Sequence, residues 1–201
     1  MGVVSFPLSL YINETAVAVL SGAEHTIVTT YDAQTGHQLY QSPVFPGSPL
    51  GMEILSPDWP GDPTRDIITL SDNGHVRRFH HLLLAWDTPL SKMVKGTPRF
   101  IATSLSKVYV VSIVSHSKHS SLSVTTLDSV NGAILETHQL DSFLLPQDDV
   151  QVVGSHSSAP LAIWHEKGKL KANVLGTKSI TTLAADVSPL SSRTLLTAAQ
   201  L

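Results

Sequence analysis

The feature that most constrains this chain is a strand–turn–strand motif that occurs twice. Residues 28–36 run Val-Thr-Thr-Tyr-Asp-Ala-Gln-Thr-Gly, and residues 124–132 repeat the Val, Thr, Thr, Asp and Gly at the same offsets. Val, Thr and Tyr favour a pleated, half-buried strand. The aspartate can accept hydrogen bonds from a turn backbone, and the glycine can adopt a positive φ without steric cost. The motif therefore predicts an antiparallel hairpin at both places.

A weaker middle copy lies between the two. Asp128 follows Asp32 by 96 residues, a distance too long for one repeat and suitable for two. Asn73 and Gly74 form a strong hairpin-turn dipeptide, and the strand-like residues 75–79 follow it. Asp32, Asp128 and the Asn73-Gly74 dipeptide are therefore expected to be the structural turns of successive repeats, together with Gly36 and Gly132.

The repeat length points to one architecture. If Trp86 occupies the place of Tyr40 and Glu136, the steps between them are 46 and 50 residues. A period of about 40–50 residues made of strands and turns is typical of β-propeller blades. We therefore predict an all-β fold, a partial β-propeller of quinoprotein or WD-like type with about four blades of antiparallel strands.

Strand and turn signals divide the single domain, residues 1–201, into four blades and an incomplete fifth. The approximate bounds are residues 12–42, 50–90, 98–140, 148–178 and 180–201. The clearest strand, residues 107–114, is an almost continuous β-branched run and is expected to be buried on both faces. Because four blades and a fraction do not obviously close a ring, we expect these residues to be part of a larger protein.

The composition and net charge of the chain restrict the kinds of binding partner that we expect. Charged residues make up 14% of the chain, against about 25% in a typical globular protein, and the net charge is −3. The basic clusters, Arg77-Arg78 and the lysines between Lys167 and Lys171, fit the outer faces of strands. Nucleic-acid binding, which usually needs a basic stripe, is not expected. No uncharged apolar run reaches about 18 residues, so this segment is not expected to span a membrane.

Catalytic chemistry was sought among the acids and hydroxyls. A quinone-dependent dehydrogenase would need a carboxylate base and a bound cation beside its cofactor. The candidate acids all lie in loops or at strand starts, where solvated carboxylates are common; they are Asp58, Asp62, Asp148 and Asp149. Residues 154–157, Gly-Ser-His-Ser, lack the second glycine and the following helix of a nucleophile elbow. The chain is therefore expected to have no catalytic residues, no cofactor and no enzymatic activity.

Ten histidines raise the question of a metal site. The closest pairs in sequence are His116 with His119 and His80 with His81. A zinc site requires three or four converging ligands. His116 and His119 lie in a serine-rich loop with no acid or cysteine nearby, and His80 and His81 are adjacent in a turn, so on a strand they would point apart. These histidines are predicted to be exposed polar residues, and no metal is expected.

The three tryptophans are candidates for a contact surface. Trp86 and Trp164 are expected to pack in the core or between blades. Trp59, in a proline-rich loop, is the best candidate for an exposed contact, although local packing explains it equally well.

The turn at residues 31–40 resembles the repeat of quinoprotein-type propellers, in which an Asp-Ala-x-Thr-Gly turn precedes a strand ending in Leu-Trp or Leu-Tyr. Residues 128–135 match it less closely. Residues 70–77, Leu-Ser-Asp-Asn-Gly-His-Val-Arg, and residues 84–87, Leu-Ala-Trp-Asp, extend the likeness. In order and spacing, over roughly residues 12–185, the chain resembles the amino-terminal lumenal propeller of the subunit 1 family of the endoplasmic reticulum membrane protein complex, in a fungal-like form.

The resemblance implies a non-enzymatic scaffold on the lumenal side of the endoplasmic reticulum membrane. Its partners would be the other subunits of the complex and client membrane proteins, because the complex inserts tail-anchored and multipass transmembrane segments. Asn13 begins an Asn-Glu-Thr glycosylation acceptor, which fits that compartment, although an ordinary exposed asparagine before a strand explains it as well. The alternatives are a quinone-dependent dehydrogenase-like propeller and a soluble peptide-binding propeller.

Overall fold

The computed structural model describes residues 8–13, 16–55, 66–80, 83–90, 96–104, 106–145, 148–155 and 158–185. Every regular element among these residues is a β-strand, and the strands form four separate sheets in which neighbours run antiparallel. No helix within these ranges is long and apolar enough to cross a membrane. The all-β prediction is confirmed.

Each sheet consists of strands that are consecutive in the chain. The first sheet contains β1 (Leu8–Asn13), β2 (Ala16–Ser21), β3 (His25–Asp32) and β4 (Gln38–Gln41), and the short β5 (Phe45–Pro46) also pairs with β3. The second contains β6 (Pro49–Leu55), β7 (Asp66–Ser71), β8 (His75–His80) and β9 (Leu83–Pro89). The third contains β10 (Thr97–Ser104), β11 (Lys107–Ser115), β12 (Ser120–Asp128) and β13 (Ile134–Gln139). The fourth contains β14 (Val150–Ser155), β15 (Ser158–Glu166), β16 (Lys169–Val174) and β17 (Ile180–Ala185).

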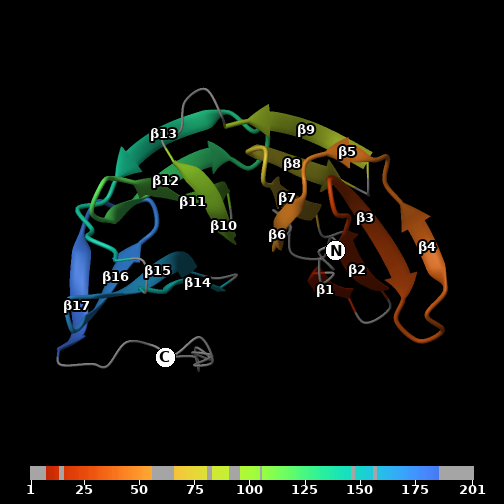
Figure 1. The fold of residues 1–201 in the computed structure, drawn as a ribbon. Helices are drawn as coiled ribbons and strands as arrows, with labels where there is room; N and C mark the ends of the chain where they lie inside the picture. The colour runs from red at the N-terminus through yellow and green to blue at the C-terminus, as the bar shows by residue number, and fades with distance from the viewer. Residues whose placement is uncertain are drawn as a thin grey trace.

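The four sheets stand side by side in an arc around a common centre, as the blades of a propeller do (Figure 1). The first strand of each sheet lies innermost, so that β1 neighbours β6, β6 neighbours β10, and β10 neighbours β14. The fourth strands, β4, β9, β13 and β17, form the outer edges. Within the described residues, the arc is open between the fourth sheet and the first (Figure 1). The predicted partial propeller of four blades is confirmed.

Two predicted blade bounds are wrong. The first sheet begins at Leu8 and not near residue 12, because residues 8–13 form an innermost strand. The segment from Ile180 does not open a fifth blade, because it pairs with β16 as the outer strand of the fourth sheet. The remaining part of the expected fifth blade, residues 186–201, lies outside the described residues.

The register of the outer strands confirms the alignment of the repeats. In each of the first three sheets, a β-bulge interrupts the pairing of the third and fourth strands close to the turn that connects them. Beyond the bulge, Tyr40 pairs with Thr30, and Trp86 pairs with Arg78. Glu136 likewise pairs with Thr126. Tyr40, Trp86 and Glu136 therefore occupy the same position in successive repeats.

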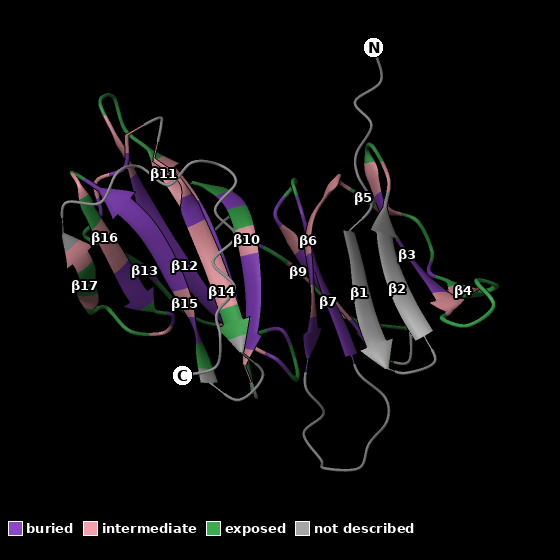
Figure 2. Ribbon diagram, turned by 90° about the horizontal axis from the view of Figure 1, so that it is seen from below, coloured by how far each residue is buried: buried purple, intermediate pink, exposed green. Residues whose placement is uncertain are grey.

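The core lies between adjacent sheets. In β11, Val108 and Val110 pack toward the second sheet, whereas Tyr109 and Val111 pack toward the fourth. All four side chains are buried, as the β-branched run predicted. Figure 2 shows the same burial along β7 and β12, with exposed residues gathered at turns and outer strands. The sheets in the middle of the arc carry buried apolar side chains on both faces. Each of them must therefore pack against a neighbouring sheet on either side.

Candidate functional site

The first predicted turn, residues 32–36, is called the Asp32 turn below. The Oδ1 atom of Asp32 accepts hydrogen bonds from the N–H groups of Gln34 at 3.0 Å and Thr35 at 2.6 Å, and from the Thr35 hydroxyl at 2.8 Å. These bonds, chiefly the one from the Thr35 N–H, hold the pKa of Asp32 below its usual value. Gly36 has φ +70° and donates to the Asp32 carbonyl at 2.9 Å. The turn is closed by its own backbone and one carboxylate.

The second copy, residues 128–132, is called the Asp128 turn and has the same local geometry. Asp128 Oδ1 accepts from the N–H groups of Val130 at 2.8 Å and Asn131 at 3.0 Å. Gly132 has φ +72° and donates to the Asp128 carbonyl at 3.0 Å. The sequence repeat therefore corresponds to one turn conformation formed twice.

The Asp128 turn is docked on the second sheet. The carbonyl of Ser129 accepts from Arg78 Nη1 at 2.6 Å and from Trp86 Nε1 at 3.1 Å. The Thr88 hydroxyl donates to the Gly132 carbonyl at 2.8 Å. A Cβ atom on Gly132 would lie only 2.6 Å from Thr88 Oγ1. This turn thus joins the third sheet to the outer strands of the second.

The Asp32 turn lies on the outer side of the first sheet, away from the second. Its Ala33, which corresponds to the fully buried Ser129, is exposed. A Cβ atom on Gly36 would meet nothing within 4 Å. Among the described residues, no side chain from another sheet donates a hydrogen bond to this turn.

In the second sheet, the turn between β7 and β8 contacts the linker that follows the first sheet. Gly74 has φ +78° and donates to the Ser71 carbonyl at 2.9 Å. The amide of Asn73 donates to the Pro46 carbonyl at 3.0 Å and its oxygen accepts from the Ser71 hydroxyl at 2.8 Å. Asn73 therefore connects the linker strand β5 with the hairpin between β7 and β8.

Arg77 was expected on the outer face of a strand, but its side chain is fully buried. It donates to Asp87 Oδ2 at 3.0 Å, to the Ser71 hydroxyl at 3.1 Å and to the Pro46 carbonyl at 3.1 Å. Its guanidinium carbon also lies 5.1 Å from the ring centroid of Phe45. These partners could not be predicted from the sequence, because they come from segments up to 31 residues away.

The neighbouring Arg78 is also largely covered, with 14% of its side chain exposed. It forms an ion pair with Asp66, and His80 Nδ1 lies 2.8 Å from the other oxygen of the same carboxylate. Both basic side chains thus converge on one buried acid in the second sheet. His81, the second member of the predicted pair, lies outside the described residues.

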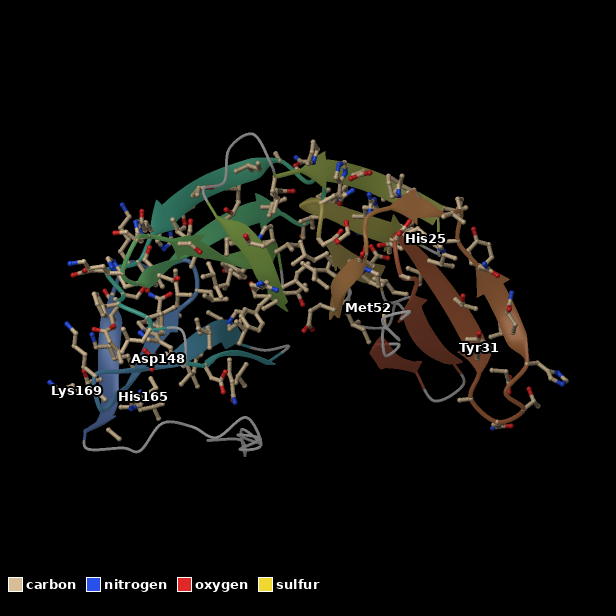
Figure 3. All side chains as sticks on the ribbon, viewed as in Figure 1. His25, Tyr31, Met52, Asp148, His165 and Lys169 are labelled. Atoms are coloured by element: carbon tan, nitrogen blue, oxygen red, sulfur yellow. The ribbon has the colours of Figure 1, made fainter. Side chains whose placement is uncertain are left out.

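The predicted acid candidates do not converge on a cofactor site in the described residues. The side chain of Asp148 is 4% exposed; its Oδ2 accepts from the Leu145 N–H at 2.7 Å, and its Oδ1 lies 3.4 Å from His165 Nδ1. Figure 3 shows Asp148 and His165 beside each other at the fourth sheet. Asp149 follows it and is half-buried. Asp58 and Asp62 lie outside the described residues.

His116 and His119 belong to a stack of rings and not to a cluster of ligands. Their ring centroids are 4.8 Å apart, and His119 stacks on Phe143 at 4.4 Å. The ammonium of Lys167 lies 4.6 Å from the Phe143 centroid. His116 Nε2 is 3.0 Å from the Ser121 hydroxyl. In the described part of the chain, no three His, Cys, Asp or Glu side chains gather closely enough to hold a metal ion.

The two tryptophans that can be placed both serve packing. Trp164 is fully buried between the third and fourth sheets and donates to Glu166 Oε2 at 3.2 Å. Burial alone would raise the pKa of Glu166, but hydrogen bonds from Lys171, Trp164 and the Phe143 N–H outweigh it and lower the pKa. Trp86 packs between the second and third sheets. Trp59 lies outside the described residues.

Two features were not predicted from the sequence. Glu53, on the innermost strand β6, has a pKa raised to about 7 by burial. Large apolar side chains also lie exposed along the outer strands: Leu39 on β4 (58%), Leu83 on β9 (65%), Leu135 on β13 (52%) and Leu183 on β17 (53%). We call these four the leucine rim. Period-2 patterning did not reveal them, because three of the four occupy bulge positions.

Asn13 is the last residue of β1 and pairs with Ala16. The other two residues of its glycosylation acceptor, Glu14 and Thr15, lie outside the described residues. Of residues 154–157, the first two end β14 and the last two lie outside the described residues.

No family model and no curated protein matches the chain. Among solved structures it is similar to the dihydro-heme d1 dehydrogenase NirN in complex with DHE, a β-propeller protein, with TM-score 0.53 and 12% identity over 83% of this chain and 34% of that one. It also aligns with the computationally designed Ika8 protein (TM-score 0.48, 10% identity, 90% of this chain and 62% of that one) and with BBS1N in complex with ARL6DN (0.40, 13%, 88% and 68%). The chain thus spans about a third of the NirN chain, and at this identity the likeness shows the propeller fold alone.

Proposed function

We propose that this chain is a non-enzymatic interaction scaffold that contacts protein partners through its outer edges. The observation that carries the proposal is the leucine rim. Each of the four sheets presents a leucine on its outermost strand with more than half of the side chain exposed. Apolar side chains gathered on one surface mark sites of protein contact, whereas isolated ones are ordinary. Here the four leucines lie on separate sheets, and their recurrence on every outer strand points to a partner that extends along the outer edge of the arc.

The inner polar side chains support the same function. Arg77, Arg78 and Trp86 bind backbone carbonyls of neighbouring sheets or linkers. Asp148 accepts from a backbone N–H of the preceding linker. These groups hold adjacent sheets and their linkers together, and a scaffold requires such a rigid array of sheets.

The resemblance to the subunit 1 family of the endoplasmic reticulum membrane protein complex suggests a setting for this scaffold. In that setting the sheets lie on the lumenal side of the membrane. The partners are other subunits of the complex, which inserts transmembrane segments, and client membrane proteins. The acceptor at Asn13 is compatible with glycosylation there.

Co-purification tests the proposal. The tagged chain, directed to the lumen of the endoplasmic reticulum, is isolated from detergent-solubilised membranes and its companions are identified by mass spectrometry. Subunits of the membrane protein complex are expected with the wild type, and less of them with Leu135→Arg combined with Leu183→Arg. Lys118→Glu, an exposed change in the loop between β11 and β12, is the matched control. If the complex subunits are absent, or if the rim variant retains them fully, the proposal is wrong.

A further inference from the structure

We propose that β17, the outer strand of the fourth sheet, receives an extended segment of a partner protein, which pairs with it as a fifth strand and carries an acidic residue near each end. β17 contains Leu183 of the leucine rim, so this inference rests on the proposed function. It adds the backbone conformation and the charge that the partner must present.

β17 offers an unpaired backbone edge. It pairs with β16 on one side, and no strand among the described residues pairs with its other side. In Figure 1 it is the blue strand at one end of the arc. Thr181, Thr182 and Leu183 are exposed. The N–H and C=O groups along such an edge can bind a further strand, which is one way in which sheets recognise extended peptides.

The other outer strands have features that discourage such pairing. β9 contains Asp87 and Pro89, β13 contains Glu136, and β4 is only four residues long. Charges, prolines and short length are common protections of an exposed edge in natural proteins. A β-bulge interrupts the pairing of all four outer strands, so the bulge does not distinguish β17 from the rest.

β17 lacks the other three protections. Its six residues, 180–185, are Ile-Thr-Thr-Leu-Ala-Ala, with no charge and no proline. Isoleucine and threonine favour strands. A segment of this length and composition at an exposed edge pairs readily with another strand. The pairing is therefore expected at β17 and not at β4, β9 or β13.

The charge around β17 selects the kind of partner. Residues 167–185, from the turn before β16 to the end of β17, contain four lysines and no acidic residue, although the net charge of the whole chain is −3. Two of these lysines are already engaged. Lys171 forms an ion pair with Glu166 at 2.6 Å, and the ammonium of Lys167 lies 4.6 Å from the centroid of the Phe143 ring.

The other two lysines, Lys169 and Lys178, lie at the two ends of β17. Lys178 comes two residues before the start of the strand, and Lys169 is paired with its last residue, Ala185. Both lysines are exposed, and neither forms an ion pair within the described residues. Figure 3 shows Lys169 at the outer edge of the fourth sheet, beside β17. An added strand with a neutral centre and a carboxylate near each end would complement these two charges.

Binding of a peptide to the 201-residue chain tests the pairing. The probe is a fluorescently labelled nine-residue peptide of alternating valine and threonine between two terminal aspartates, and binding is followed by fluorescence anisotropy. This peptide is expected to bind saturably. A version with proline at its centre should not bind, because proline cannot donate to the ladder. A version with terminal lysines should bind about tenfold more weakly, since two exposed attractions become repulsions.

Reversal of charge on the protein locates the site. Lys169→Glu combined with Lys178→Glu should reverse the preference, so that the lysine-ended peptide binds more tightly than the aspartate-ended one. Arg99→Glu combined with Lys118→Glu makes the same change of net charge at exposed residues of the third sheet. This matched control should keep the preference of the wild type. Circular dichroism confirms that both double variants are folded.

Several results would overturn the inference: no binding of the aspartate-ended peptide, equal binding of its proline version, or a charge-reversed variant that keeps the wild-type preference. A chain that binds no peptide and sediments at twice 21.6 kDa would show that a second copy occupies the edge, and the inference would again be wrong. The proposed function fails separately, because absence of the complex subunits from the co-purified material leaves the peptide measurement unchanged.

Discussion

Gly36 and Gly132 occupy equivalent positions in two turns, but only Gly132 contacts another sheet. Replacing each with alanine therefore distinguishes the cost of backbone strain from the cost of disturbing the contact between sheets. Both glycines have a left-handed φ, +70° and +72°, so alanine at either site costs about 1–2 kcal/mol of backbone strain. At Gly132 the new Cβ would also lie 2.6 Å from Thr88 Oγ1 and 2.7 Å from the Trp86 ring, whereas at Gly36 it meets nothing within 4 Å. Overpacking of this kind costs about 1–3 kcal/mol more. Gly132→Ala should therefore be the more destabilising change by that amount.

Urea unfolding of the two variants measures the difference. Tryptophan fluorescence and circular dichroism should be followed together. In thermal unfolding, a chain of this size shifts by about 2–4 °C for each kcal/mol. Gly132→Ala should thus melt several degrees below Gly36→Ala. Equal destabilisation by the two substitutions would refute the docking of the Asp128 turn on the second sheet.

Four further predictions concern other parts of the chain. Arg77→Met should lower the free energy of unfolding by about 3 kcal/mol, because it removes three hydrogen bonds of a fully buried guanidinium, to Asp87, the Ser71 hydroxyl and the Pro46 carbonyl. The exposed Arg99→Met is the control and should change little. Because the pKa of Glu53 in the folded chain, about 7, lies above its ordinary 4.5, the wild type should lose stability as the pH rises between these values. Glu53→Gln should remove this loss, with a gain of at most about 3 kcal/mol at pH 8 and none at pH 4; a constant gap across the range contradicts the assignment. In the lumen of the endoplasmic reticulum, Asn13→Gln should abolish an endoglycosidase-sensitive shift in gel mobility, and a wild type without that shift contradicts glycosylation. Addition of a quinone cofactor with Ca²⁺ should give no dye reduction, and turnover would contradict a non-enzymatic chain.

Local sequence chemistry was sufficient to predict the repeated turns and the strands that flank them. The repeated Asp and Gly define a turn whose hydrogen bonds are internal, so its form follows from the residues alone. The equivalence of Tyr40, Trp86 and Glu136 also followed from spacing and is confirmed by the strand register. Periodicity was informative here because each strand has to cover one or both faces against a neighbouring sheet.

Properties that depend on contacts between sheets could not be predicted. The Asp32 and Asp128 turns are alike in sequence, yet one is exposed and the other is docked. Arg77 appears in a basic pair typical of a surface, but its partners come from a distant linker. Ile180 follows a turn much as a first strand would, and only its pairing with β16 makes it a fourth strand. In each case the deciding neighbour is remote in the chain.

The arrangement of the sheets around a common centre can be tested by one engineered disulfide. A Cβ atom on Gly51, in the innermost strand of the second sheet, would lie 4.0 Å from the Cβ of Ile101 in the innermost strand of the third. That separation is within the range of about 3.5–4.5 Å found in disulfides, and the chain has no other cysteine to compete. Gly51→Cys with Ile101→Cys should therefore cross-link completely under mild oxidation, whereas Gly51→Cys with the outer Val130→Cys should not. A folded Gly51–Ile101 double variant that keeps both thiols free would contradict the packing of successive sheets side by side.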